Sequence, residues 1–131
     1  MTKHIKPLQT ANYETIFYAD RSGREPILEY IQELDARTDK DSRIKVNKIY
    51  DYIDYLEEMG TAGKEPYMKH LDGEIWELRP IRDRILFAAW DGTTFILLHH
   101  FVKKTRETPK REIDQAKRNL ADYRERSKEH E

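Results

Sequence analysis

The segment at residues 67–111 constrains the fold more than any other, because short apolar runs alternate there with tight-turn signals. Asp72-Gly73 and Asp91-Gly92 are dipeptides that favour the two-residue turns of β-hairpins. The pattern predicts four short strands, the first ending near Asp72 and the others at residues 74–79, 84–90 and 94–103. The last of these is long and almost continuously apolar, which is typical of the centre of a sheet.

The N-terminal half predicts one more strand and two helices. Residues 13–19 are aromatic and β-branched, as in a strand, and Pro26 fits the first turn of a helix. We expect Thr38 to cap a second helix, with Asp41 three residues later, and Gly60 to end it. The two helices should pack as an αα-hairpin through two apolar stripes, Ile27, Ile31 and Leu34, then Val46, Ile49, Ile53 and Leu56.

A last helix should open at Thr108 and Pro109, with threonine as the cap and proline in the first turn. Its apolar residues repeat the same spacing at Ile113, Ala116, Leu120 and Tyr123. We therefore expect an α+β fold, with a twisted, mainly antiparallel sheet of about five strands, an N-terminal αα-hairpin and a C-terminal helix. Because the loop at residues 60–66 separates two halves without complete cores, residues 1–131 are predicted to form one domain.

Positive charge is concentrated in the predicted sheet, although the net charge of the chain is only −1. Residues 67–111 carry 9 Lys or Arg against 6 Asp or Glu, whereas residues 1–66 carry 10 against 13 and residues 112–131 carry 5 against 6. A positive field focused on one face can steer a polyanion towards a protein that is neutral as a whole. Ordinary scatter of charge explains the same counts equally well.

Several classes of protein are disfavoured by what the sequence lacks. It contains no cysteine, which excludes disulfides and thiolate chemistry and suits a cytoplasmic protein. It has no apolar run long enough for a membrane span and no apolar signal region at its N-terminus. No zinc-binding spacing, glycine-rich phosphate loop or nucleophile triad appears, so we expect neither a metal nor a cofactor.

Arg79 and Arg84 are the candidate ligands for a phosphate group. They lie five residues apart on either side of a predicted hairpin, so both guanidinium groups could reach one phosphate. Two such groups bind phosphate bidentately and stabilise charge that develops in a transition state. The alternative for Arg79 is a structural salt bridge with Glu77 or Asp83.

Lysines and histidines surround the predicted arginine pair. Lys69 lies on the preceding strand, and Lys103 and Lys104 stand just before the last helix, whose N-terminus attracts anions. His99 and His100 should point to opposite faces of their strand. We expect one of them to be satisfied in the core and the other, with His100 as the candidate, to face the basic cluster as an acid or base.

Tyr50, Tyr52 and Tyr55 recur along the second predicted helix beside acidic residues. Two interpretations are open. Tyrosines are enriched at interfaces, so the acidic, tyrosine-rich hairpin at residues 26–59 is a candidate docking face for a partner. Packing at the edge of an amphipathic seam explains the same pattern and is the simpler interpretation.

Five runs of the sequence resemble one family of bacterial toxins: D-S-R-I-K-V-N-K-I, G-x-x-W-E-L-R, D-R-I-L-F, L-L-H-H-F-x-K-K-T and T-P-x-x-E-I-x-x-A. Together they are similar to the HigB toxins of the phage-derived Gp49-like branch, within the RelE/ParE toxin superfamily. The resemblance covers nearly the whole chain and implies a RelE-like fold. It implies a metal-independent endoribonuclease that cleaves mRNA, typically on the translating ribosome, and so inhibits translation.

The resemblance also implies partners and residue roles. The expected partner is a HigA-type antitoxin, whose helix-turn-helix domain binds operator DNA on behalf of the complex. Arg79 matches the arginine that contacts the scissile phosphate, Arg84 the arginine that opens the next strand, and Lys69 a basic residue that acts as base or phosphate ligand. Lys103 and Lys104 match the basic pair after the last strand.

Proton transfer is the step for which the resemblance gives no clear residue. RelE has a tyrosine near its C-terminus, and residues 105–111 contain none, so His100 or a lysine would have to replace it. A free lysine has a pKa of about 10.4, so Lys69 would need crowding by cations or burial to act as a base. Two rivals stay open: a ParE-like toxin that acts on gyrase, and a non-enzymatic phage-derived interaction protein.

Overall fold

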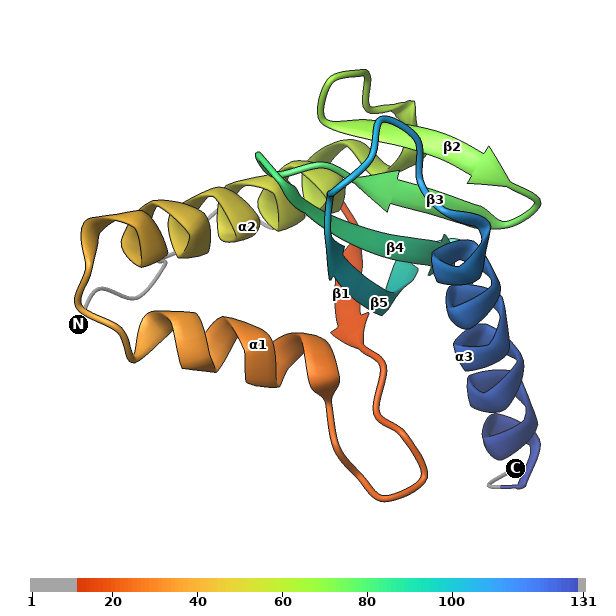
Figure 1. Ribbon diagram of the computed structural model, residues 1–131. Helices are drawn as coiled ribbons and strands as arrows, with labels where there is room; N and C mark the ends of the chain where they lie inside the picture. Colours follow the sequence, from red (N-terminus) through yellow and green to blue (C-terminus); the bar gives the residue numbers. More distant parts are fainter. Residues whose placement is uncertain (1–11, 130–131) are drawn as a thin grey trace.

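The computed structural model describes residues 12–129, which form a five-stranded sheet with helices on both faces (Figure 1). Between the second helix and the second strand lies one short 3₁₀ turn, Gly60–Ala62. In chain order the helices and strands are β1 (Glu14–Phe17), α1 (Pro26–Asp35), α2 (Lys40–Met59), β2 (Met68–Asp72), β3 (Ile75–Leu78), β4 (Asp83–Ala89), β5 (Thr94–Val102) and α3 (Lys110–Glu129).

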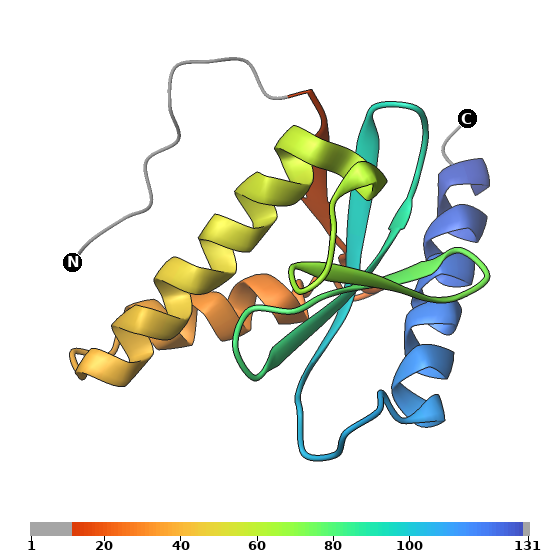
Figure 2. The same cartoon turned by 90° about the horizontal axis from the view of Figure 1, so that it is seen from above.

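The sheet has the strand order β1-β5-β4-β3-β2. β1 runs parallel to β5, and every other neighbouring pair is antiparallel. In the view of Figure 2 the sheet lies between α2 and α3. The predicted α+β class, with the αα-hairpin, five mainly antiparallel strands and a C-terminal helix, is confirmed. β5 is an interior strand as predicted, but the middle position belongs to β4.

The alternation along β4 explains how one sheet supports two helical layers. Ile85 and Phe87 belong to a core cluster with the α1–α2 hairpin, whereas Leu86 and Ala88 belong to a cluster with α3. Successive side chains of a strand point to opposite faces, so an unbroken apolar run is expected where both faces are covered. All four of these side chains are fully buried.

Two predicted helix caps are wrong. The N-cap of α2 is Asp39, whose carboxylate accepts a hydrogen bond from the Ser42 amide, and not Thr38. A carboxylate at this position also interacts favourably with the helix dipole. Thr108 does not cap α3, because its hydroxyl donates to the carboxylate of Glu77. Gly60 ends α2 as predicted.

None of the helices in residues 12–129 is long and apolar enough to cross a bilayer.

The tyrosines of α2 pack at the seam, as the simpler interpretation predicted. Tyr50, Tyr52 and Tyr55 are half-buried against the cluster that joins the hairpin to the sheet. The predicted apolar stripes of α1, α2 and α3 all lie in the two core clusters as well. The α1–α2 hairpin therefore packs against the sheet through both aliphatic and aromatic side chains.

Asp83 anchors α1 to the sheet through two hydrogen bonds. The carboxylate is 1% exposed and accepts from the Tyr30 hydroxyl at 2.7 Å, with His100 Nε2 at 2.9 Å from the same oxygen. The rings of Tyr30 and His100 stack with their centroids 3.9 Å apart. Burial alone would raise the pKa of Asp83, but the bonds from His100 and Tyr30 outweigh it and hold the pKa below its usual range.

Replacing Asp83 with asparagine is expected to lower the free energy of unfolding by about 1–3 kcal/mol at neutral pH. The folded state favours the carboxylate, so its contribution is complete above the unfolded pKa of about 3.9 and is lost as the pH falls through the lower folded pKa. The difference in the free energy of unfolding between the wild type and the variant, measured by urea unfolding, should therefore become smaller below about pH 4. Asp51→Asn, at an exposed position of α2, is the control. If this difference were the same at about pH 3 and about pH 7, the ionised carboxylate of Asp83 would not be the source of the stabilisation.

Candidate functional site

A hollow of about 250 Å³ lies on the α3 face, where β3 ends and β4 begins. The segment that follows β5 runs past β3 before α3 begins, and supplies one wall of the hollow (Figure 1). Five cationic side chains and two carboxylates line it: Lys69, Arg79, Arg84, Lys103, Arg106, Glu77 and Glu107. We call this hollow the basic pocket. Its excess of positive charge suits an anionic ligand.

Antiparallel pairing explains why residues far apart in the sequence meet in the basic pocket. Lys69 of β2 lies directly opposite Glu77 of β3, and Arg84 of β4 lies opposite Phe101 of β5. Side chains of directly opposed residues lie on the same face of a sheet. Of the residues predicted to form a site, Lys69, Arg79, Arg84 and Lys103 are therefore brought together.

The two arginines converge on one buried carboxylate, that of Glu77. Its Oε1 lies 3.5 Å from Nε of Arg79 and 3.9 Å from Nε of Arg84. The side chain of Glu77 is only 3% exposed and also accepts a hydrogen bond from Thr108. A buried charge needs partners, and here both partners are cations that line the pocket. Glu77 thus fixes where the two guanidinium groups stand.

Arg84 is the deeper of the two arginines and is held by the backbone. Its Nη1 donates to the carbonyl oxygens of Ile81 and Asp83, both at 2.9 Å. Ile81 has a φ of 56°, a strained conformation for a β-branched residue, at the turn between β3 and β4. Burial lowers the pKa of Arg84, as does the charge of Arg79, while Glu77 opposes both. The guanidinium group nevertheless stays charged at physiological pH.

Arg79 keeps donors available to a ligand. Its side chain is 23% exposed and makes a second ion pair with Glu65, at 3.5 Å between Nη1 and Oε1. The Nε of Arg79 is buried and has no hydrogen-bond partner within residues 12–129. The predicted alternative of a salt bridge with Glu77 is thus present, but it leaves part of the guanidinium group facing the pocket. The Asp83 carboxylate bonds Tyr30 and His100 instead.

The predicted lysine pair is divided between two hollows. Lys103 lines the basic pocket, and its amide donates to the carbonyl of Arg82 at 2.7 Å. Arg82 returns a hydrogen bond from Nη2 to the Lys103 carbonyl at 2.8 Å, which fixes the chain just beyond β5. Lys104 is exposed and lines a neighbouring hollow with Arg111 and Glu112. The two lysines therefore line adjoining hollows, which share Phe101 and Thr105.

His100 does not face the basic pocket, contrary to the expectation. It points to the α1 side of the sheet, where Asp83 and Tyr30 hold it. His99 points to the other face, as predicted, and its Nε2 lies 2.7 Å from a carboxylate oxygen of Glu112. His70 is also a lining residue, but its ring packs against Trp76 on the α1–α2 side of the sheet, with centroids 5.1 Å apart, and its Nε2 lies 2.8 Å from the carbonyl oxygen of Gly73. A register shift leaves Leu98 as an extra residue in β5, but the alternation resumes at His99 and His100 and separates the two histidines.

Residues 29–121 match the protein family described as Phage derived protein Gp49-like (DUF891). The match spans well over half of the 131 residues and includes all the residues that line the basic pocket. The chain belongs to the Gp49-like family. A search of curated proteins found no match.

Glu77, Arg106 and Thr108 are among the polar pocket residues of this Gp49-like protein that were not predicted as site residues. Glu77 was considered only as a possible partner of Arg79, Thr108 only as a helix cap, and Arg106 not at all. The alternation of side chains along a strand could have identified Glu77, because residues 77 and 79 point to the same face. No local pattern signals Arg106 or Thr108, which enter the pocket only because the segment after β5 folds back.

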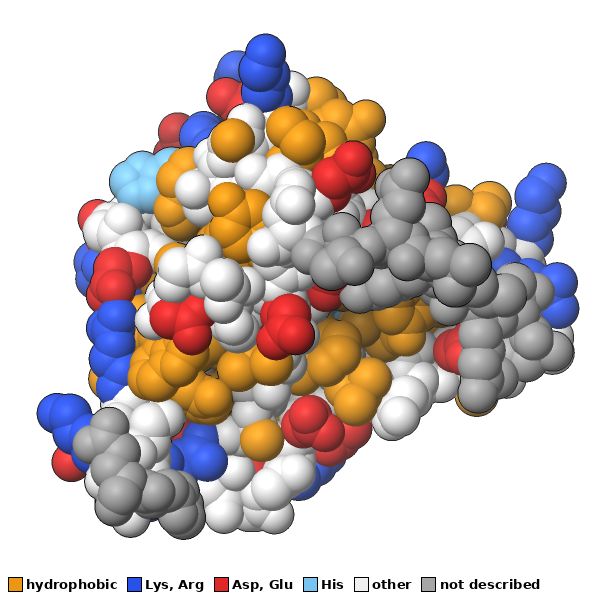
Figure 3. All heavy atoms as spheres, turned by 180° about the vertical axis from the view of Figure 1, so that it is seen from behind, with side chains coloured by type: hydrophobic (Ala, Val, Ile, Leu, Met, Phe, Trp, Pro, Cys, Tyr) orange, Lys and Arg blue, Asp and Glu red, His pale blue; other side chains and the backbone are white. Residues whose placement is uncertain are grey.

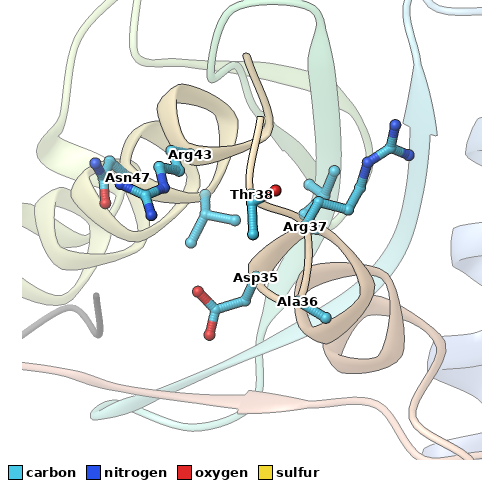
Figure 4. A pocket seen from close by; sticks show the side chains of 8 residues that line it. Asp35, Ala36, Arg37, Thr38, Arg43 and Asn47 are labelled. Atoms are coloured by element: carbon cyan, nitrogen blue, oxygen red, sulfur yellow. The ribbon is translucent and has the colours of Figure 1, made fainter. Parts of the chain in front are cut away.

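A second hollow of about 250 Å³ in the Gp49-like protein lies at the link between α1 and α2 (Figure 4). Its charged lining residues are Asp35, Arg37 and Arg43. Arg37 pairs with Asp39 at 3.2 Å, and its side chain points away from Asp35 and Arg43 in Figure 4. The remaining lining charges balance, so this hollow suits a polyanion less well than the basic pocket.

Charge is unevenly spread over the surface of the Gp49-like protein. On the face seen in Figure 3, Lys and Arg side chains lie mainly towards the margins, and acidic and apolar side chains occupy the middle. Within residues 12–129, no group of three or more His, Asp or Glu side chains is arranged to hold a metal ion. The cationic lining of the basic pocket suits the binding and stabilisation of negative charge.

Proposed function

We propose that this Gp49-like protein is the toxin of a type II toxin–antitoxin system and a metal-independent endoribonuclease that cleaves mRNA. The observation that carries the proposal is the convergence of Arg79 and Arg84 on Glu77 inside a pocket with five cationic side chains. Such a site binds the phosphate of an RNA backbone and opposes the charge that develops when the phosphate is attacked. The motifs shared with HigB toxins of the RelE/ParE superfamily support the same assignment.

In the proposed reaction the RNA supplies its own nucleophile. Lys69, opposite Glu77 on β2, accepts the proton of a 2′-hydroxyl, and the 2′-oxygen then attacks the adjacent phosphorus. Arg79 and Arg84 stabilise the negative charge of the phosphorane. The bond from phosphorus to O5′ breaks, and the ammonium group of Lys103 donates a proton to the leaving oxygen. The products are a 2′,3′-cyclic phosphate and a 5′-hydroxyl end.

We propose that the protein acts as one domain, in the cytoplasm and on ribosome-bound mRNA. Its partner would be a HigA-type antitoxin with a helix-turn-helix domain, through which alone the complex contacts operator DNA. Lys104 lies outside the basic pocket but adds positive charge beside it, which suits contact with the flanking RNA backbone. His100 has no role in this reaction, because Asp83 and Tyr30 hold it on the opposite face.

The proposal is tested by inducible expression with and without the neighbouring open reading frame, followed by mapping of mRNA ends. New internal 5′ ends that require phosphorylation before ligation are expected, because the reaction leaves a 5′-hydroxyl group. Growth should stop only when the antitoxin is absent. Accumulation of cleaved gyrase–DNA complexes with intact mRNA would instead identify a gyrase toxin. Intact mRNA without a growth defect would identify a non-enzymatic interaction protein.

A further inference from the structure

Exposed apolar side chains gather at the end of the sheet that holds the basic pocket. Within residues 12–129, five large hydrophobic residues are exposed, and three of them are Tyr67, Ile81 and Val102. Tyr67 directly precedes β2, Ile81 lies in the turn between β3 and β4, and Val102 ends β5. Exposed apolar groups clustered beside a charged pocket indicate a contact surface.

Tyr67 is the one aromatic residue of these three, and it lies on a platform of other tyrosines. Its ring is stacked on that of Tyr55, with centroids 4.3 Å apart and planes inclined by 24°. It is also tilted against Tyr52 at 5.1 Å. Tyr67 is nevertheless 39% exposed, so the platform covers only part of the ring. An aromatic ring held in this way offers its free surface to a planar ligand.

The platform is fixed by its surroundings. The Tyr55 hydroxyl accepts a hydrogen bond from the Lys64 amide at 3.2 Å. A Cβ atom added at Gly63 would come within 2.7 Å of the Tyr55 ring and 2.6 Å of Met68, so the loop lies tightly against the platform. Little conformational entropy would then be lost when a ligand stacks on Tyr67.

Backbone pairing places Tyr67 directly beside the proposed phosphate ligand. The Arg79 amide donates to the Tyr67 carbonyl at 2.9 Å, which continues the pairing of β2 and β3 by one residue. Side chains of opposed residues start about 5 Å apart. Burial raises the pKa of Tyr52 in the platform, and the positive charge of Arg84 opposes that rise. The Tyr67 ring leans on α2 and is not among the side chains that line the basic pocket, so the aromatic platform borders the pocket beside Arg79.

We propose that Tyr67, supported by Tyr55 and Tyr52, is a base-stacking subsite that holds a nucleobase of the RNA next to the phosphate in the basic pocket. This inference rests on the proposed function and adds the recognition of a base to it. Stacking on an aromatic ring contributes about 1–3 kcal/mol per base and tolerates any base, because every base has a π face. Tyr67 therefore positions the RNA chain and biases the nucleotides that flank the cleavage site.

The experiment compares the full-length protein with Tyr67→Phe and Tyr67→Leu, which keep the apolar contact with Tyr55 and differ in the aromatic face. Each is expressed with a reporter mRNA, the rate of cleavage is measured, and the nucleotides around the new ends are counted. We expect Tyr67→Phe to behave as wild type. Tyr67→Leu should cleave about fivefold to a hundredfold more slowly and with an altered nucleotide distribution. Thermal unfolding of the purified proteins shows whether the fold is retained.

The outcomes separate the subsite from the proposed function. If Tyr67→Leu is folded and cleaves at the wild-type rate with the wild-type distribution, the subsite is wrong and the endoribonuclease stands. If the wild-type protein itself cleaves nothing, both are overturned. If Tyr67→Leu keeps cleavage but loses co-purification with the neighbouring helix-turn-helix protein, the platform is a protein-docking face and the base subsite is wrong.

Discussion

Replacing Arg79 with alanine is expected to lower the rate of mRNA cleavage by about two to three orders of magnitude. The guanidinium group faces the basic pocket with a buried Nε that has no hydrogen-bond partner within residues 12–129. Its loss removes a donor from the place where charge develops on the phosphate. Cleavage is measured from the appearance of new mRNA ends, and growth arrest should disappear with it.

Two control variants make the Arg79 result specific. Arg43→Ala removes an arginine from the hollow at the α1–α2 link and should leave cleavage unchanged. Arg79→Lys keeps the charge but loses the planar fork, so it should restore only part of the activity. The alanine variant should still co-purify with the antitoxin, because the fold is retained. An Arg79→Ala protein that remains fully toxic would remove Arg79 from the proposed mechanism.

Replacing Glu77 with glutamine is expected to lower the free energy of unfolding by about 3 kcal/mol. The side chains of Glu77 and Arg84 are 3% and 7% exposed, so neutralising Glu77 leaves a buried guanidinium group without its counter-charge. Cleavage should fall as well, because Glu77 holds both arginines at the phosphate position. Urea unfolding gives the stability, and mapping of mRNA ends gives the activity.

Glu65→Gln is the matched control, because both carboxylates pair with Arg79 at the same distance. Glu65 lies 3.5 Å from Nη1 of Arg79, and Glu77 lies 3.5 Å from Nε. The side chain of Glu65 is 68% exposed, so water compensates its charge and the loss should stay below about 1 kcal/mol. Equal losses for the two variants would show that burial does not decide the contribution of Glu77.

The strained turn between β3 and β4 connects stability to the site. The carbonyl of Ile81 accepts a hydrogen bond from Arg84 while the residue adopts a positive φ. Conformations of this kind persist only where the surrounding structure imposes them. Here the positive φ of Ile81 points its carbonyl oxygen at the guanidinium group of Arg84. The turn therefore joins β3 to β4 and also helps to position the charge of Arg84.

Most of the fold could be predicted because local patterns determine it. Apolar residues at helical spacing in α1, α2 and α3 all enter the core, and the Asp91-Gly92 turn joins β4 to β5. The N-terminal caps of α2 and α3 could not be predicted with the same success. Asp39 and Thr38 are both good caps by residue type, and the choice depends on where the helix begins.

The sequence by itself determined the α+β class, the αα-hairpin, the succession of five strands along the chain and the basic residues available for a site. Tertiary structure alone decided which of these residues meet. Lys103 enters the basic pocket while Lys104 and His100 do not, and Glu77 becomes the buried centre between two arginines. The physical reason is that composition and periodicity are local, whereas strand register and the return of the chain after β5 set distances between residues far apart in sequence.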